Sequence, residues 1–151
     1  MSRPWTCLGP VDVAPLAEWL ARARPHFPAP SAPSKPQRIE APPDLVVPVV
    51  AAVLAYPPVD LTAHRVVLSR VLPGQRHDLH VDKMRADWVT RIHVPILTNE
   101  GAWMLWEEEG REVHFEAGKA YTFDATRRHA FGNDGPTERV HLMFDLLKGD
   151  A

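Results

Sequence analysis

Residues 139–146 read Arg-Val-His-Leu-Met-Phe-Asp-Leu, and residues 91–96 read Arg-Ile-His-Val-Pro-Ile. In both stretches apolar residues occupy every second position, the period of a β-strand with one face in a core. On the other face each stretch pairs an arginine with a histidine. The pairs are Arg139 with His141 and Arg91 with His93. These two stretches predict two strands, each with an apolar face for a core and a second face that is polar.

The sequence around them continues the same pattern. After Pro58, short β-like runs alternate with turn residues such as Pro73-Gly74 and Thr98-Asn99. The runs are residues 64–72, 88–97, 102–107, 112–115, 120–123, 129–132 and 139–146. Many short strands separated by turn signals are typical of a β-sandwich or β-barrel. The region 64–146 is therefore predicted to be a mainly β core.

The first 58 residues differ in character. Residues 11–23 have apolar side chains at helical spacing and predict an amphipathic helix. Residues 45–54 are strongly apolar, which suits a short buried helix or a strand, and we favour the helix. Residues 25–43 are rich in proline, alanine and serine, as in an extended covering segment or a mobile loop. We expect a single domain over 1–151, with residues 1–58 forming N-terminal helices and a Pro-rich cover.

Composition excludes several classes of protein. Apolar residues make up 45% and charged residues 24% of the 151 residues, as in an ordinary globular domain. The net charge of −2, without a long basic run, gives no reason to expect nucleic acid or a membrane surface as partner. Cys7 is the sole cysteine, and no signal peptide or membrane-length apolar run is present. We therefore expect a cytoplasmic protein.

The densest group of potential metal ligands is the stretch His77-Asp78-Leu79-His80-Val81-Asp82. In an extended chain His80 and Asp82 share a face and His77 points to the opposite face. With a second histidine from a distant strand they would form the two-histidine, one-carboxylate set of non-heme iron(II) oxygenases. With 8 histidines in 151 residues, however, a His-x-Asp triplet is expected by chance roughly 0.5 times per chain. The triplet alone decides nothing.

The arginines of the two alternating strands add a second signal. A single arginine on such a strand is ordinarily a solvent-facing charge. Two strands that each place an arginine beside a histidine favour a shared polar site instead. Because the guanidinium fork matches a carboxylate with two parallel hydrogen bonds, the pattern suits a small dicarboxylate.

Further motifs follow in a fixed order between Val66 and Asp145. They are Leu72-Pro73-Gly74, His80-Val81-Asp82, Arg91-Ile92-His93-Val94-Pro95-Ile96, Thr98-Asn99, Gly118, Phe123-Asp124, His129-Ala130-Phe131-Gly132-Asn133 and Arg139-Val140-His141-Leu142. In this order and spacing the chain resembles the aspartyl/asparaginyl β-hydroxylase family, which also includes bacterial hydroxylases of free proline. With Asp82 present, the chain resembles the bacterial branch, whose ligand triad is complete.

The resemblance implies a double-stranded β-helix, a jelly-roll or cupin-like fold, that binds iron(II) and the co-substrate 2-oxoglutarate. The implied iron ligands are His80, Asp82 and His129. Arg139 and Ser69 match the residues that hold the distal carboxylate of 2-oxoglutarate. Arg91 and His93 match residues near the keto-acid end and the first coordination shell.

The implied activity is that of a dioxygenase. It would use O₂ to hydroxylate an unactivated C–H bond of an amino acid, or of an amino-acid residue in a peptide or small molecule, with release of succinate and CO₂. Candidate substrate-binding positions are Lys83, Arg85, Asp87 and Trp88, with the 25–44 segment as a lid. Trp103 and Trp106 face opposite sides of their strand, so one would be core and the other could line the pocket.

Two alternatives share parts of this pattern. A cupin-like metalloenzyme that does not use 2-oxoglutarate would keep the barrel and histidines without needing Ser69 and Arg139. A non-catalytic metal-binding barrel would have no reason to retain the His-x-Asp, the distant histidine and the arginine ten residues beyond it together. The binding of 2-oxoglutarate separates these alternatives.

Overall fold

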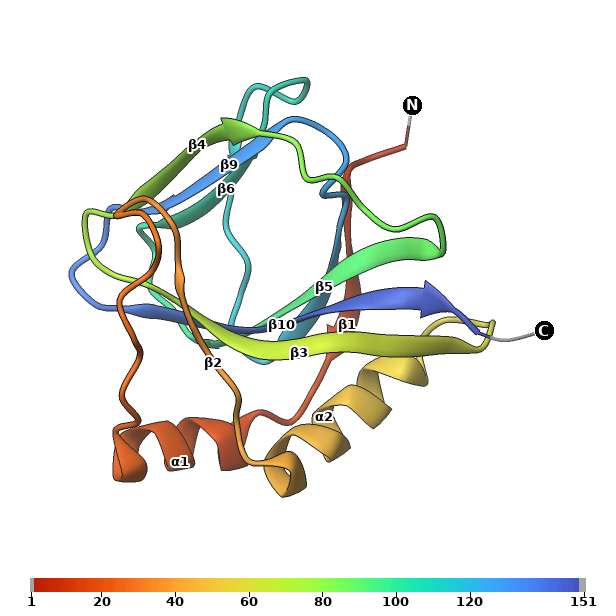
Figure 1. The fold of residues 1–151 in the computed structure, drawn as a ribbon, viewed down its shortest axis with the longest axis horizontal. Coiled ribbons are helices and arrows are strands. Elements are labelled where there is room, and N and C mark those ends of the chain that lie inside the picture. Colours follow the sequence, from red (N-terminus) through yellow and green to blue (C-terminus); the bar gives the residue numbers. More distant parts are fainter. Residues whose placement is uncertain (1, 150–151) are drawn as a thin grey trace.

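Two antiparallel β-sheets face each other in the computed structural model, which describes residues 2–149 (Figure 1). The larger sheet has the strand order β1-β8-β5-β10-β3-β2, and the smaller has the order β4-β9-β6-β7. The strands of the large sheet are β1 (Trp5–Pro10), β2 (Gln37–Ile39), β3 (Leu61–Val71), β5 (Trp88–Leu97), β8 (Lys119–Phe123) and β10 (Arg139–Lys148). Those of the small sheet are β4 (Arg76–His80), β6 (Ala102–Trp106), β7 (Glu112–Val113) and β9 (His129–Asn133).

From β3 onward the chain passes back and forth between the two sheets. β3, β5, β8 and β10 belong to the large sheet, whereas β4, β6, β7 and β9 belong to the small one. The last strand, β10, lies between β3 and β5 and pairs with both along nearly its whole length. Every polar side chain on the inner face of one sheet therefore lies opposite the other sheet. The predicted mainly β fold is confirmed.

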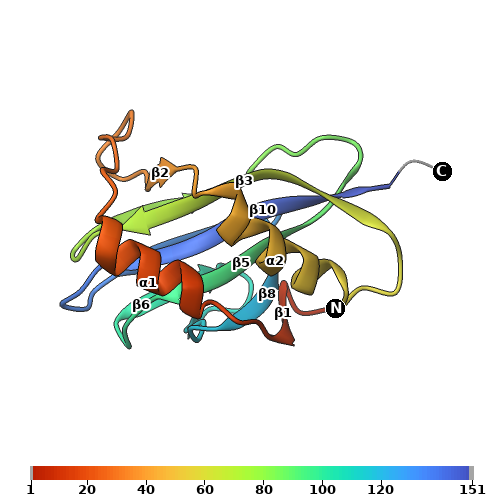
Figure 2. The same ribbon diagram turned by 90° about the horizontal axis from the view of Figure 1, so that it is seen from below.

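Two helices cover the outer face of the large sheet, as Figure 2 shows from below. They are α1 (Ala14–Ala23) and α2 (Pro43–Leu54), so both segments favoured as helical contain a helix. Each has a proline in its first turn, where the missing N–H costs nothing. The α1 helix begins later than the pattern suggested, because the backbone N–H of Val11 donates to Gly118 O at 2.8 Å instead. Among the described residues, neither helix has the length and apolar content needed to cross a bilayer.

The main hydrophobic core fills the space between these helices and the large sheet. Leu16 and Leu20 of α1 are buried there with Val49 and Val53 of α2. The large sheet contributes the alternating apolar residues of β5 and β10. These are Ile92, Val94, Ile96, Val140, Leu142, Phe144 and Leu146. The predicted division of β5 and β10 into a core face and a polar face is correct.

A second, smaller core lies between the sheets at one end of the barrel. Trp106 and Phe123 are buried there with their ring centroids 4.4 Å apart. Of the two tryptophans of β6, Trp106 is thus the core residue. Trp103 lies on the other side, where its indole N–H donates to Asp134 at 3.0 Å, outside the main cavity.

Candidate active site

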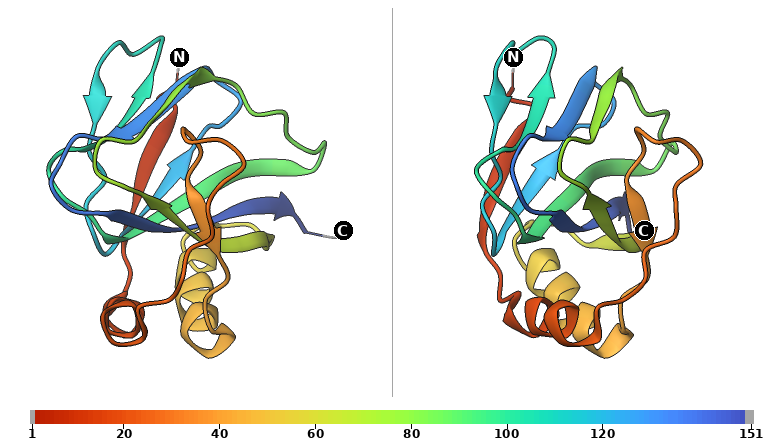
Figure 3. Two further views of the ribbon diagram at one scale, coloured as in Figure 1. Left: turned by 60° about the vertical axis from the view of Figure 1, so that its left-hand side comes forward. Right: turned by 90° about the vertical axis from the view of Figure 1, so that its left-hand side faces the viewer.

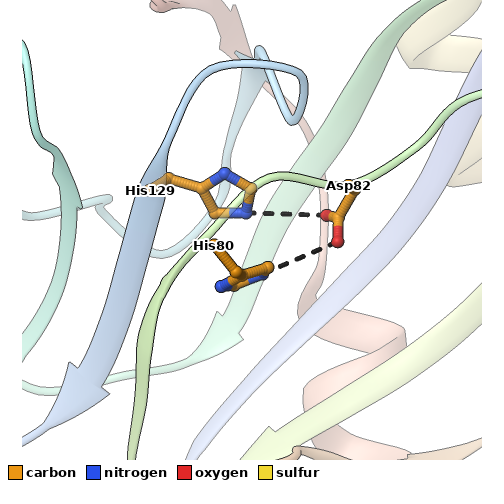
Figure 4. A group of neighbouring side chains, drawn as sticks. All are labelled: His80, Asp82 and His129. Atoms are coloured by element: carbon orange, nitrogen blue, oxygen red, sulfur yellow. Dashed lines mark ion pairs between the residues drawn. The ribbon is translucent and has the colours of Figure 1, made fainter.

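His80, Asp82 and His129 come together at the open end of the small sheet (Figure 4). His80 is the last residue of β4 and His129 the first of β9, and the register of these paired strands places the two opposite each other. Asp82 follows β4, and its carboxylate oxygens lie 3.6 Å from His80 Nε2 and 3.5 Å from His129 Nε2. One ligand atom from each residue lies within 4.8 Å of the other two, which fits a single metal ion.

Both histidines are oriented through their other ring nitrogen. Nδ1 of His80 lies 2.7 Å from Asp78 O, and Nδ1 of His129 lies 2.7 Å from Arg127 O. A carbonyl oxygen only accepts, so each Nδ1 carries the proton and each Nε2 keeps its lone pair toward Asp82. Metal-binding histidines are ordinarily held in this way. Burial further lowers the pKa of His80, which favours the neutral ligand form.

Asp82 is held as an anion. Burial alone raises its pKa, but the contact with His129 and the charge of Arg91 outweigh that effect and lower the pKa to about 2. Arg91 Nη1 donates to Asp82 Oδ2 at 2.9 Å. The donor set, two imidazoles and a carboxylate, matches a non-heme iron(II) site.

Arg91 is itself fixed by a residue that the sequence analysis did not single out. Asp145 lies directly opposite Arg91 in the β5–β10 register and accepts from its Nε at 2.9 Å. The Trp88 indole donates to the same carboxylate oxygen at 3.2 Å. A hydrogen-bonded chain therefore runs from Trp88 through Asp145 and Arg91 to Asp82. The alternation that placed Arg139, His141 and Met143 on one face also places Asp145 there. The sequence pattern was therefore sufficient to assign Asp145 to the polar face.

One orientation was predicted wrongly. His77 was expected to point away from His80, but their ring centroids are 4.0 Å apart and both line the main cavity. The cause is a register shift in the β4–β9 pairing between these two residues. A bulge inserts a residue and cancels the simple alternation of faces.

The ligand cluster opens into a cavity of about 590 Å³ between the sheets. Ser69, Arg91, His93 and Arg139 of the large sheet all line it together with His80, Asp82 and His129, so the structure brings together the residues that the resemblance implied for iron and 2-oxoglutarate. Met104, Phe123, Phe131 and Met143 supply its apolar surface. Small-molecule sites are typically cavities of this size with a few convergent polar groups.

Arg139 is a buried cation that has no counter-charge among residues 2–149. Its side chain is 2% exposed, and its Nε has no hydrogen-bond partner. Its Nη1 lies 4.0 Å from Met104 Sδ, and its guanidinium carbon lies 5.4 Å from the centroid of the Phe131 ring. Desolvation lowers its pKa to about 9. An unpaired buried charge is costly, and an anionic ligand is the natural group to satisfy it.

His93 lies between the ligand cluster and the interior of the barrel. Its Nδ1 is 3.0 Å from Nδ1 of His141, and its ring packs on Phe123 with a centroid distance of 4.9 Å. Burial, reinforced by Arg139, lowers the pKa of both histidines well below the ordinary value, so both are neutral. One imidazole donates and the other accepts, which fixes the tautomer of each.

The proline-rich segment forms one wall of the cavity. Pro28, Ala29, Pro30, Ser31, Lys35 and Pro36 line it. The segment rises from α1 beside the open end of the two sheets (Figure 3). Gln75 ties it to the barrel, because its amide Nε2 donates to Pro33 O at 2.9 Å and to Lys35 O at 2.7 Å.

The candidate substrate-binding positions after the metal motif divide into two groups. Lys83 lines the cavity. Arg85 and Asp87 form a bidentate ion pair at 2.8 and 2.9 Å on the surface, and Trp88 donates to Asp145 instead of lining the cavity. Two arginines of the cavity were not singled out individually, Arg38 of β2, which falls in the 25–44 segment, and Arg65 of β3. No local signal marks them, because their position depends on long-range strand pairing.

A barrel of two antiparallel sheets with this ligand set and a buried cation in its interior defines a metal-dependent oxygenase. Residues 37–148 match the model of the family described as aspartyl/asparaginyl beta-hydroxylase. The chain belongs to this family. A comparison with curated proteins finds no significant match.

Solved structures share the fold at low sequence identity. A viral collagen prolyl hydroxylase from Paramecium bursaria Chlorella virus-1, in its 2-oxoglutarate complex, aligns with a TM-score of 0.73 and 12% identity over 98% of both chains. A Pseudomonas putida prolyl-4-hydroxylase gives 0.68 and 15%, over 99% of this chain and 95% of that one. A 2OG-Fe(II) oxygenase-family protein from Burkholderia pseudomallei gives 0.61 and 12%, over 93% and 92%.

These findings confirm the predicted family and enzyme class. The protein is a 2-oxoglutarate-dependent dioxygenase, and His80, Asp82 and His129 form the set that could bind its iron.

Proposed function

We propose that this enzyme hydroxylates an unactivated C–H bond of an amino acid or an amino-acid residue. His80, Asp82 and His129 would hold iron(II), and Arg139 with Ser69 would hold the distal carboxylate of 2-oxoglutarate. The observation that carries the proposal is Arg139, a buried guanidinium without an anion that lines the same cavity as the ligand cluster. Neither alternative considered from the sequence accounts for such a charge.

The bound iron and the surrounding side chains would have separate roles in the reaction. Iron(II), when bound together with the keto acid and dioxygen, supplies the oxidation that converts C–H to C–OH with release of succinate and CO₂. Arg91 and Asp145 keep the Asp82 carboxylate turned toward the two histidines. The neutral His93–His141 pair offers a polar but uncharged surface beside the ligand cluster. Met104, Phe123 and Phe131 line the cavity with apolar side chains that limit the access of water.

Ser69 supports the assignment of the carboxylate site. It is 1% exposed, and the β3–β10 register places it opposite His141, two positions from Arg139 on the same face of the sheet. A serine hydroxyl donates one hydrogen bond, and a guanidinium donates two in parallel to a carboxylate. The two side chains therefore complement each other as partners of one carboxylate.

The fold also supports a finer description. We propose that residues 64–146 form a double-stranded β-helix, with the alternation of strands between the two sheets as its basis. The N-terminal helices and the Pro-rich segment would complete one domain over 1–151. The solved relatives include proteins described as prolyl hydroxylases, which makes proline a first substrate to try.

The test needs no knowledge of the substrate. Purified protein is mixed anaerobically with iron(II) and then with 2-oxoglutarate, and the visible iron-to-keto-acid charge-transfer band is recorded. We expect the band to appear and Arg139→Ala to weaken it far more than it weakens iron binding. Iron binding without a band would contradict the use of 2-oxoglutarate and favour the cupin-like alternative. Absence of both would mean that the resemblance to the family is one of fold alone.

A further inference from the structure

Two arginines of the cavity remain without a role after the metal and keto-acid sites are assigned. Arg38 of β2 and Arg65 of β3 both line its wall. Among the described residues neither forms an ion pair, whereas Arg70, on the same strand as Arg65, is paired with Gln37 and Glu138. The chain thus provides a partner for a neighbouring arginine outside the cavity and none for these two.

Arg65 adopts a backbone conformation that is unfavourable for its type. Its φ is 58°, in the left-handed region that ordinary side chains rarely adopt. It lies in a bulge of β3, because Met143 pairs with Val67 whereas Asp145 pairs with His64. Bulges near active sites redirect side chains, and strain of this kind is typical of functional positions. Here the strained residue is one that lines the cavity.

Arg38 approaches the same region from the neighbouring strand. The β2–β3 register places it opposite Ser69, the residue assigned to the co-substrate carboxylate. Desolvation lowers the pKa of Arg38, and the charges of Arg91 and Arg65 lower it further. The side chain is nevertheless exposed by surface area, so it lies at the mouth of the cavity rather than deep inside.

The cavity wall carries many more basic than acidic side chains. Its basic side chains are Lys35, Arg38, Arg65, Lys83, Arg91 and Arg139, and its acidic side chain is Asp82. Arg91 is neutralised by Asp82 and Asp145, and Arg139 would be neutralised by 2-oxoglutarate. A small keto acid occupies only part of about 590 Å³, so a second molecule has room beside it. The positive charge at the mouth is then left for that second molecule.

We propose that Arg38 and Arg65 bind a carboxylate of the substrate, so that the enzyme acts on a free acid such as an amino acid rather than on an internal residue of a polypeptide. This inference rests on the proposed function and selects between its two substrate classes. Guanidinium groups bind carboxylates bidentately, whereas an internal peptide residue has no main-chain carboxylate to offer. The α-carboxylate would then be fixed at the mouth with the side chain directed toward the ligand cluster.

The experiment compares acids with their amides in a protein that cannot turn over. Zinc(II) replaces iron(II), 2-oxoglutarate is saturating, and the melting temperature is recorded with each free L-amino acid and with its primary amide. We expect one or more acids, beginning with L-proline, to raise the melting temperature while the matching amide does not. Arg38→Gln and Arg65→Gln should each weaken binding of that acid by roughly 10-fold, because each variant loses charge-assisted hydrogen bonds to the carboxylate at the mouth of the cavity. Arg111→Gln, which removes an exposed arginine outside the cavity, should leave it unchanged.

Arg65→Asn separates a binding role from a structural one. Asparagine tolerates the left-handed region, so the protein without ligand should melt at the wild-type temperature or above it while acid binding is lost. A lower melting temperature of the ligand-free variant, with acid binding retained, would show that Arg65 is structural and overturn the proposal.

Three other outcomes are distinguishable. Equal binding of an acid and its amide, or acid binding that survives both glutamine substitutions, overturns the carboxylate site. A panel in which no free acid stabilises the wild type also overturns it. The proposed function is tested separately, and it fails if the iron–2-oxoglutarate band is absent. If the band is normal but acids bind no better than their amides, only the role of Arg38 and Arg65 is overturned.

Discussion

The two faces of the large sheet are chemically opposite, although both contain buried side chains. The outer face, beneath α1 and α2, is made of leucine, isoleucine, valine and phenylalanine side chains. The inner face carries Ser69, His93, Arg139, His141 and Asp145, all less than 9% exposed. Both faces come from the same strands, and in β10 the two kinds of residue alternate. The division between stability and function therefore runs through each strand rather than between regions of the chain.

The arginines of the inner face differ in whether their charge is paired. Arg91 has two carboxylate partners, whereas Arg139 has none. Arg91, whose charge is paired, can hold the Asp82 side chain in place. Arg139, whose charge is unpaired, is available to bind an anion from solution. If this comparison is right, substitutions on the outer face should change stability, and those on the inner face should change binding.

The largest effect is expected from His129→Ala. Loss of one of three ligands should abolish iron-dependent turnover, because two remaining ligands do not retain the metal in a defined geometry. Iron binding and succinate formation measure the loss, and the circular dichroism spectrum should stay close to that of the wild type. Turnover in the variant would refute the assigned ligand set.

Arg139→Met should separate binding from stability. Without the guanidinium, affinity for 2-oxoglutarate should fall by roughly 30-fold or more, as when one partner of a buried charge pair is removed. The ligand-free protein should become more stable by about 1–4 kcal/mol, because an unpaired buried charge is replaced by an apolar side chain of similar length. Calorimetric titration and denaturant unfolding measure the two quantities. A parallel decrease in both would mean that Arg139 is structural.

Leu142→Ala is the matched substitution on the outer face, three residues further along β10. Leu142 is fully buried, so the variant should lose about 2–5 kcal/mol of unfolding free energy. The folded fraction should bind 2-oxoglutarate with wild-type affinity. A specific loss of affinity would show that the two faces are not independent.

Asp145→Asn should produce the smallest of these effects. Arg91 would lose the charged partner opposite it, so Asp82 would be held less firmly and metal affinity should fall by roughly 10-fold. Trp88→Phe removes only the second hydrogen bond to Asp145 and serves as a milder comparison. Metal titration measures both, and unchanged affinity in Asp145→Asn would show that Asp82 does not depend on this chain of contacts.

Much of the site was predictable because it rests on local periodicity. Alternation alone separated the core and polar faces of β5 and β10, and the His80-x-Asp82 spacing placed two ligands on one side. His129, Ser69 and Arg139 were assigned to the site because the order of motifs along the chain resembles that of the family. Residues 45–54 also formed the helix that their apolar content favoured over a strand.

The rest depends on pairing that no local pattern encodes. A bulge turned His77 toward His80, and another set the strained conformation of Arg65. The short strand β2 was hidden in a segment whose prolines suggested only an extended cover, and Arg38 within it was not singled out. Asp145 was visible in the alternation, but its importance follows from its cross-strand neighbour Arg91.

The central position of β10 has a consequence for biosynthesis. This strand joins β3 to β5, yet it is the last element of the fold to leave the ribosome. Until it emerges, the nascent chain exposes the unpaired edges of β3 and β5, which are prone to pair with other chains. Arg139 begins the same strand, so the proposed co-substrate site would be created in the step that closes the sheet. Any product truncated before residue 139 would be both unable to bind 2-oxoglutarate and prone to aggregate.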